Sequence, residues 1–186
     1  MRPGPGDIPL NQAEAKAAAF VKSIGLPAGD FDPNRCWLEP QSLTNIRAWS
    51  LSGERYRIDV DSKTGRIVAF MNLRPGKRPN SQAPIKLRFT DRARSKAYVL
   101  DYAARLGVPN DCGVEWLTPR NALDSGLDAR LQFGARFTRN RKDVAILTFW
   151  SDTGEPLALY LYERGVSTAT AAASTSARIH LPPLPK

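Results

Sequence analysis

Residues that could do chemistry are few and widely spaced in this chain. The single histidine, His180, lies in a proline-rich stretch where no neighbouring base or nucleophile is fixed. Asp59 and Asp61, followed by Gly65, superficially resemble a calcium loop. Lys63 occupies a ligand position, however, and no glutamate stands where the bidentate ligand is required. The spacing therefore predicts a tight turn, and we assign no catalytic residue and no metal ligand.

The two cysteines, Cys36 and Cys112, are too far apart for a Cys-x-x-Cys redox motif and too few for a zinc site. Each lies between an expected helix and a tryptophan-led segment. A disulfide that joins them is geometrically conceivable and would favour an oxidising compartment. The alternative is a pair of small buried thiols, because free cysteine commonly packs as a core residue.

No motif in the sequence indicates nucleotide binding or acid–base catalysis. No phosphate loop of the form G-x-x-x-x-G-K-[ST] occurs, and residues 126–134 are better interpreted as a strand between turns. Spacing alone does not make Asp59 and Asp61 an acid–base pair, because carboxylates on alternate strand positions usually face solvent. The sequence predicts a protein that is not an enzyme and uses no cofactor.

Positive charge is the one property that points beyond the fold. The 186 residues include 27 Lys and Arg against 18 Asp and Glu, a formal net charge of +9. Cations gather in residues 74–96 and again in residues 130–142. Such clusters can neutralise nucleic-acid phosphates, whereas a solvated basic surface is the alternative. The candidate phosphate contacts are Arg136, Arg139, Arg141 and Lys142.

Hydrophobic periodicity predicts the elements that position these residues. Apolar side chains recur at three- and four-residue spacing from Asn11, the expected N-cap, to residue 24, which predicts an amphipathic helix. Thr90 and Asp91 begin a second helix, which Gly107 ends. After each helix, apolar and polar residues alternate and turn residues interrupt the alternation, which predicts antiparallel strands.

The same order of elements occurs twice in the sequence. Residues 20–27 align without a gap with residues 102–109, and the turns at 60–65 and 149–154 also correspond. Internal duplication would fix the architecture, and chance similarity between two helix-plus-hairpin segments is the alternative. We predict an α+β protein of two tandem repeats, each with one helix packed on an antiparallel three- to four-stranded meander sheet.

The expected boundaries follow from composition. Residues 1–10 are an N-terminal extension without the apolar core of a secretion signal, and 11–73 and 90–165 are the two repeats. Residues 74–89 are rich in proline and cations and predict a linker. Residues 166–186 are rich in Ala, Ser, Thr and Pro and predict a tail, either a spacer or a proline-rich ligand. No stretch approaches the roughly 20 apolar residues of a membrane-spanning helix.

Residues 56–70, YRIDVDSKTGRIVAF, resemble the strand-turn-strand signature of PepSY-like domains, which follows a helix in that family too. The resemblance implies an α+β unit of cystatin-like shape. It also implies a location outside the cytoplasm, periplasmic or secreted, and a partner that is a peptidase, which such domains are thought to inhibit or bind. The family supplies no catalytic residue.

Two functions are therefore expected from different classes. The first is a non-catalytic protein-binding or peptidase-regulating module of PepSY-like type, with Trp49, Trp116 and Tyr160 as candidate contacts. Large aromatics on strands are also typical of a core, which is the alternative for all three. The second is a basic nucleic-acid-binding protein that uses the linker and a hairpin at 138–143, although no known nucleic-acid-binding motif supports it.

Overall fold

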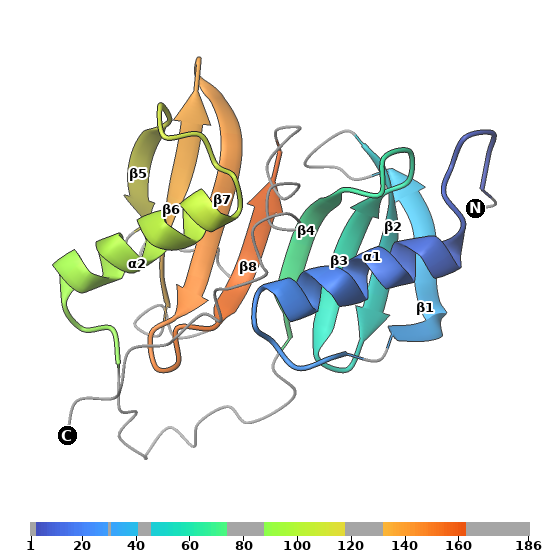
Figure 1. Ribbon diagram of the computed structural model, residues 1–186, viewed down its shortest axis with the longest axis horizontal. Helices are drawn as coiled ribbons and strands as arrows, with labels where there is room; N and C mark the ends of the chain where they lie inside the picture. Colours follow the sequence, from blue (N-terminus) through green and yellow to red (C-terminus); the bar gives the residue numbers. More distant parts are fainter. Residues whose placement is uncertain (1–2, 30, 41–45, 74–87, 118–131, 163–186) are drawn as a thin grey trace.

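Both helices of the protein lie on one face of a single antiparallel sheet (Figure 1). The computed structural model describes residues 3–29, 31–40, 46–73, 88–117 and 132–162. The elements in chain order are α1 (Leu10–Ser23), β1 (Phe31–Pro40), β2 (Arg47–Gly53), β3 (Tyr56–Asp61), β4 (Ile67–Asn72), α2 (Arg92–Arg105), β5 (Gly113–Leu117), β6 (Gln132–Arg139), β7 (Lys142–Trp150) and β8 (Pro156–Leu161).

The sheet has eight strands in the order β1-β2-β3-β4-β8-β7-β6-β5. Its two halves meet where β4 pairs antiparallel with β8, with Ala69 opposite Tyr160 and Phe70 opposite Leu159. We call this strand pair the seam. The α+β class is confirmed, but the prediction of two tandem repeats with separate meander sheets is wrong. Had β4 and β8 stayed apart, each would leave a row of backbone N–H and C=O groups unpaired, and pairing them satisfies both rows.

Each helix ends as the sequence predicts, whereas only one begins so. Gly25 and Gly107 both have φ of 76°, the left-handed conformation that glycine adopts without strain. Asp91 caps α2 by accepting from two backbone N–H groups, but Asn11 lies inside α1, which begins at Leu10 after Pro9. The expected Asn11 cap is therefore wrong: Pro9 is the N-cap residue, in an extended conformation, and its carbonyl accepts from the backbone N–H groups of Gln12 and Ala13.

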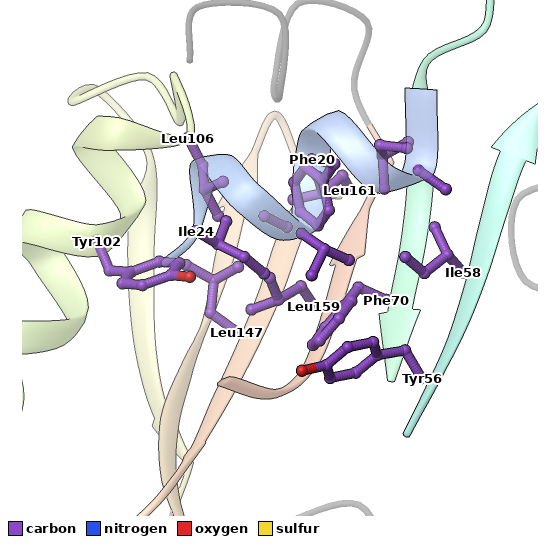
Figure 2. Packing of buried hydrophobic residues seen from close by; sticks show 14 of the residues in the cluster. Phe20, Ile24, Tyr56, Ile58, Phe70, Tyr102, Leu106, Leu147, Leu159 and Leu161 are labelled. Atoms are coloured by element: carbon purple, nitrogen blue, oxygen red, sulfur yellow. The ribbon is translucent and has the colours of Figure 1, made fainter. Parts of the chain in front are cut away.

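One hydrophobic core fills the space between the helices and the sheet, and it crosses the seam (Figure 2). Ile24 of the α1 half and Leu106 of the α2 half belong to the same buried cluster, and Figure 2 shows them close to Leu147 and Leu159. Each such aliphatic side chain contributes about 1.5–3 kcal/mol when fully buried. The shared core adds to the paired backbone in joining the two halves.

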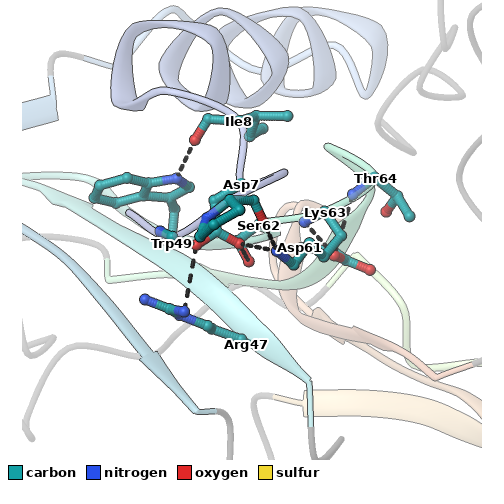
Figure 3. A network of polar contacts seen from close by, with 10 residues as sticks. Asp7, Ile8, Arg47, Trp49, Asp61, Ser62, Lys63 and Thr64 are labelled. Atoms are coloured by element: carbon teal, nitrogen blue, oxygen red, sulfur yellow. Dashed lines mark hydrogen bonds and ion pairs between the residues drawn. The ribbon is translucent and has the colours of Figure 1, made fainter. Parts of the chain in front are cut away.

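The segment before α1 is bound to the β3–β4 turn by a polar network that we call the N-terminal clamp (Figure 3). Asp7 accepts from the Ser62 hydroxyl at 2.8 Å and from the Gly4 backbone N–H at 2.7 Å. It also pairs with Lys63 at 3.0 Å and with Arg47 at 3.4 Å. Residues 4–8 of the expected N-terminal extension are therefore bound to β2 and the β3–β4 turn.

A second pair of hydrogen bonds completes the clamp. The Ile8 backbone N–H donates to the Ser62 carbonyl at 2.7 Å, and the Trp49 indole N–H donates to the Ile8 carbonyl at 2.9 Å. Together they hold the chain entering α1 against β2 and the β3–β4 turn.

An aromatic cluster anchors α2 at the corresponding place in the other half. Phe89, just before the helix, stacks on Phe133 with ring centroids 4.8 Å apart, and Tyr98 of α2 meets Phe149 edge to face at 5.4 Å. Tyr102 meets Phe149 in the same way at 4.9 Å. The Tyr98 hydroxyl reaches the carbonyl of Gly154 in the β7–β8 turn at 2.8 Å. We call these rings the aromatic anchor.

Some predicted segments fall outside the described residues. The tail at 166–186, His180 within it, and most of the expected linker at 74–89 belong to the parts that are not described. Neither of the described helices is long and apolar enough to cross a membrane.

Candidate protein-binding surface

One row of side chains runs across all eight strands on the face of the sheet opposite the helices. Side chains alternate between faces along a strand, so the neighbours of core residues such as Trp49, Ile58 and Leu147 point away from the helices. We call this surface the outer face. From edge to edge, the residues opposite one another in the row are Trp37, Ser50, Asp59, Ala69, Tyr160, Ile146, Arg136 and Glu115.

Arg57 organises the β1–β3 end of the outer face. Its guanidinium lies 3.3 Å from Glu39 and 3.6 Å from Asp59, and it also lies over the Trp37 ring at 5.7 Å. Trp37 keeps 38% of its surface exposed, which is high for so large an apolar residue. The two carboxylates therefore hold a guanidinium against an accessible indole ring.

Asp59 is the buried member of this group. It retains 5% of its surface, and burial raises the pKa of its carboxyl even though Arg57 is close. Ser50, directly opposite on β2, is also buried. A carboxylate with so little contact with water is suited to orienting Arg57 rather than to binding a ligand itself.

Arg136 organises the opposite end in a similar way. Its guanidinium donates two hydrogen bonds to Asp143, at 2.7 and 2.9 Å, and lies 3.8 Å from Glu115. The hydrogen bonds to Asp143 raise the pKa of the guanidinium. Two parallel N–H to oxygen bonds fix the plane of an arginine side chain, so this exposed cation is oriented before any partner arrives.

Tyr160 stands between the two arginines. It is half-buried and packs on a small apolar cluster of Trp150, Leu157 and Ala158. Burial, and then the negative charge of Asp59, raises the pKa of its hydroxyl. Ile146, next to it on β7, is also partly exposed, so the centre of the outer face is aromatic and aliphatic.

The structure separates the three aromatic residues that the sequence singled out as contacts. Trp49 is a core residue with 6% of its surface exposed, and its indole N–H is used in the N-terminal clamp. Trp116 lies on the helix side of β5, half-buried, with the Lys96 ammonium 4.9 Å from its ring centroid. Tyr160 alone of the three lies on the outer face.

The four predicted phosphate contacts are also divided. Arg136 is held by Asp143, and Arg139 lies 3.6 Å from Asp111. Arg141 and Lys142 are exposed at the β6–β7 turn, where neither side chain forms an ion pair with another described residue. Pairing thus neutralises two of the four cations, which weakens the case for a phosphate-binding patch.

Cys36 and Cys112 lie at opposite edges of the sheet, as free thiols. Cys36 is in β1 and Cys112 directly precedes β5. Seven spacings of about 4.8 Å between strands put the two edges about 34 Å apart, whereas bridged Cα atoms lie within about 7 Å. This separation favours the alternative of two free thiols over the disulfide that the sequence left open. Burial raises the pKa of both thiols.

Trp37, Arg57 and Glu39 are surface residues that sequence reasoning did not select. Their alternation with the core residues Leu38 and Ile58 was available as a signal. The missing information was which strands are neighbours, because only the pairing of β1, β2 and β3 brings these side chains together.

The described ranges hold no cluster of metal-ligating side chains. Within them, no three His, Cys, Asp or Glu side chains come together as metal ligands would.

No protein-family model and no curated protein matches the chain. Among solved structures, the chain is similar to the Bacillus megaterium YpeB C-terminal domain, with a TM-score of 0.49 and 9% sequence identity. That similarity covers 97% of this chain and 70% of the other, and it is a similarity of backbone fold.

Proposed function

We propose that this protein is a non-catalytic protein-binding module of PepSY-like type and that its outer face binds the partner. The observation that carries the proposal is the pair of carboxylate-held arginines, Arg57 and Arg136, on either side of Tyr160, with Trp37 accessible beside Arg57. Tryptophan, tyrosine and arginine are the residues that dominate binding energy at protein interfaces.

Preorganisation supports the same proposal. A free arginine loses rotamer freedom when a partner immobilises it, at about 0.5–1.5 kcal/mol for such a side chain. Asp143 already fixes Arg136 through two hydrogen bonds, and Glu39 and Trp37 already restrain Arg57. A partner that meets this surface therefore loses less free energy to ordering than it would on a surface of mobile cations.

The partner that we propose is a peptidase outside the cytoplasm, which the module regulates by covering part of its surface. This step rests on the PepSY-like resemblance of residues 56–70, which includes Arg57 and Asp59. The outer face contributes an alternation of acidic, basic and aromatic groups, which suits a mixed protein surface better than a uniformly anionic one.

Site-directed photo-cross-linking in the native host tests the proposal. A photoreactive phenylalanine analogue in place of Trp37 should trap a specific protein, and the same analogue in place of Lys22, exposed on α1, should not. Trp37→Ala in an otherwise wild-type chain should weaken capture of that protein at least tenfold, because truncation of a hot-spot tryptophan commonly removes 2 kcal/mol or more.

Peptidase assays with the trapped protein then separate the general function from the specific one. Saturable change of peptide hydrolysis by the wild-type chain, lost in Trp37→Ala, supports regulation of a peptidase. Trapping of nucleic acid at Trp37, or equal trapping from the Trp37 and Lys22 positions, contradicts the proposal. If nucleic acid is trapped, retention of the protein on single-stranded DNA should fall steeply as the salt concentration rises, as phosphate-driven binding requires.

A further inference from the structure

The sheet has two outer strands, β1 and β5, and their free edges differ. β1 contains Pro33 and Pro40, and its pairing with β2 shifts register between Phe31 and Cys36. Proline offers no N–H, and a shift of register bends an edge out of line, so both features prevent another strand from pairing there. The β1 edge is closed to strand addition.

The β5 edge carries neither feature. Its five residues, Gly113–Leu117, contain no proline and pair with β6 in unbroken register, from Gly113 opposite Thr138 to Leu117 opposite Gly134. Val114 and Glu115 are exposed, and within the described ranges no strand pairs with the outer side of β5. Every second residue of an edge strand directs its N–H and C=O outward, so β5 presents a row of backbone groups that no other described strand pairs with.

We propose that β5 is a docking edge for an extended segment of a partner protein, which adds to the sheet as a further strand. The proposal rests on the proposed function, because the occupant is a segment of a protein partner, and it adds where and in what conformation that segment binds. Strand addition to an exposed sheet edge is a recurring mode of peptide recognition, in which backbone hydrogen bonds give affinity and alternate side chains give specificity.

The side chains of β5 specify the chemistry of the incoming segment. Val114 and Trp116 point to the helix side, where Lys96 lies over the Trp116 ring at 4.9 Å. Glu115 points to the outer face beside Arg136. Directly opposed side chains on neighbouring strands interact, so the segment should carry apolar residues facing Val114 and Trp116 and a cation facing Glu115.

A second copy of the chain is a poorer occupant. Each chain has a formal net charge of +9, and two such chains repel one another. Antiparallel pairing of two β5 strands centred on Glu115 would also place two carboxylates opposite each other, which is unfavourable. A short apolar peptide with a single cation is repelled far less than a chain of charge +9, and it places no carboxylate opposite Glu115.

The test is an NMR titration of the full chain with the peptide acetyl-Ser-Thr-Val-Lys-Val-Thr-Ser-amide. We expect saturable shifts in the backbone amides of β5, and exchange of the β5 amides with solvent at least tenfold slower when the peptide is bound. The matched control peptide has the same side chains but N-methyl groups on alternate residues, and it should bind at least tenfold more weakly because its donors are removed.

Proline substitutions in β5 locate the contact. The N–H groups of Val114 and Glu115 point to opposite sides of the strand, so one of Val114→Pro and Glu115→Pro removes only an outward donor. That variant should keep its fold and lose at least tenfold in affinity, whereas Arg35→Pro in β1 should leave binding unchanged. If both β5 variants fail to fold, the comparison of the two peptides decides whether backbone hydrogen bonds hold the segment.

Several results would overturn the proposal. The first is the absence of saturable amide shifts, and the second is shifts confined to β1 or the helices. The third is that Val114→Pro and Glu115→Pro, both folded, each bind the peptide with the affinity of the wild type. Dimerisation through β5 would assign the edge to a second copy. Slow exchange of the β5 amides without peptide would show an edge already paired. Trp37→Ala should leave the titration unchanged, so the proposed function can fail at the outer face while the β5 result stands.

Discussion

The two helices are fixed to the same face of one sheet by different chemistry. In each half, the backbone N–H of a residue shortly before the helix donates to the carbonyl of a turn serine: Ile8 to Ser62 at 2.7 Å and Phe89 to Ser151 at 2.9 Å. Around this shared contact, the α1 half uses the charged groups of the N-terminal clamp and the α2 half uses the aromatic anchor.

The two kinds of anchor respond differently to pH and salt. The clamp depends on the ionised carboxylate of Asp7, so its strength varies with pH and salt. The aromatic anchor depends on burial, which is insensitive to both and contributes more per side chain. We therefore expect the α2 half to supply the larger stabilisation and the α1 half the larger pH dependence.

The largest effect should come from truncation of the aromatic anchor. Phe149 is fully buried and meets Tyr98, Tyr102 and Phe133. Phe149→Ala should lower the free energy of unfolding by about 3–5 kcal/mol, because it removes apolar contacts and leaves a cavity. Urea unfolding followed by circular dichroism measures the change. A loss below about 1.5 kcal/mol would contradict the dominance of the anchor.

The next effect concerns the one aromatic residue of the clamp. Trp49→Phe removes the indole N–H that donates to the Ile8 carbonyl and leaves that acceptor without its partner. The free energy of unfolding should fall by about 1–3 kcal/mol, the range for an unsatisfied buried group. The same urea measurement applies, and amide exchange at the start of α1 should become faster. Unchanged exchange there would show that the hydrogen bond does not hold the segment.

The pH dependence isolates Asp7. The Gly4 backbone N–H, followed by the Ser62 hydroxyl, lowers the pKa of Asp7 from its ordinary 3.8 to about 2. A lowered pKa in the folded state stabilises the fold above the ordinary pKa, and this contribution disappears as the pH falls from 3.8 through about 2.

Asp7→Asn should therefore reduce stability at pH 7 and flatten its decline between pH 4 and 2, as thermal melts across that range would show. Glu54→Gln is the matched control, because Glu54 is exposed at the β2–β3 turn and forms no ion pair with another described residue. If stability declined equally between pH 4 and 2 in Asp7→Asn and in the wild type, the clamp would be excluded as the pH-sensitive element.

The smallest effect is a gain in the α2 half. Arg141 has φ of 61° at the β6–β7 turn, a left-handed conformation that non-glycine residues adopt at a cost, and Asn140 before it tolerates φ of 53° better. Arg141→Gly creates the Asn-Gly pair favoured in two-residue hairpins and should stabilise the protein by about 0.5–1 kcal/mol. Differential scanning calorimetry should show a higher Tm; a lower one would mean that the Arg141 side chain contributes contacts of its own.

Local features of the fold could be predicted from the sequence. Periodicity predicts both helices, glycines at 25 and 107 mark their ends, and Thr90 and Asp91 mark the start of the second, where Asp91 is the cap. These features depend on residues within a few positions of one another. The turn around Asp61 was also anticipated, since Asp61 accepts from the backbone N–H groups of Lys63 and Thr64.

Long-range features could not be predicted in this way. The pairing of Phe70 with Leu159 joins residues far apart in the sequence, and no local pattern specifies the partner of an edge strand. The contact between Trp37 and Arg57 on the outer face could not be predicted for the same reason, because it depends on which strands are neighbours. Trp49 and Trp116 were ambiguous for a related reason, because an aromatic residue on a strand fits a core or a surface equally well until the covering helix is placed.

Hydrogen exchange at the seam tests the central claim, that the two halves share one continuous sheet. Native-state exchange in low concentrations of denaturant should show that amides in β4 and β8 around Phe70 and Leu159 open only with global unfolding, together with those of β3 and β7. The claim would be contradicted if the β4 and β8 amides exchanged through a separate opening of lower free energy and the two halves then unfolded independently.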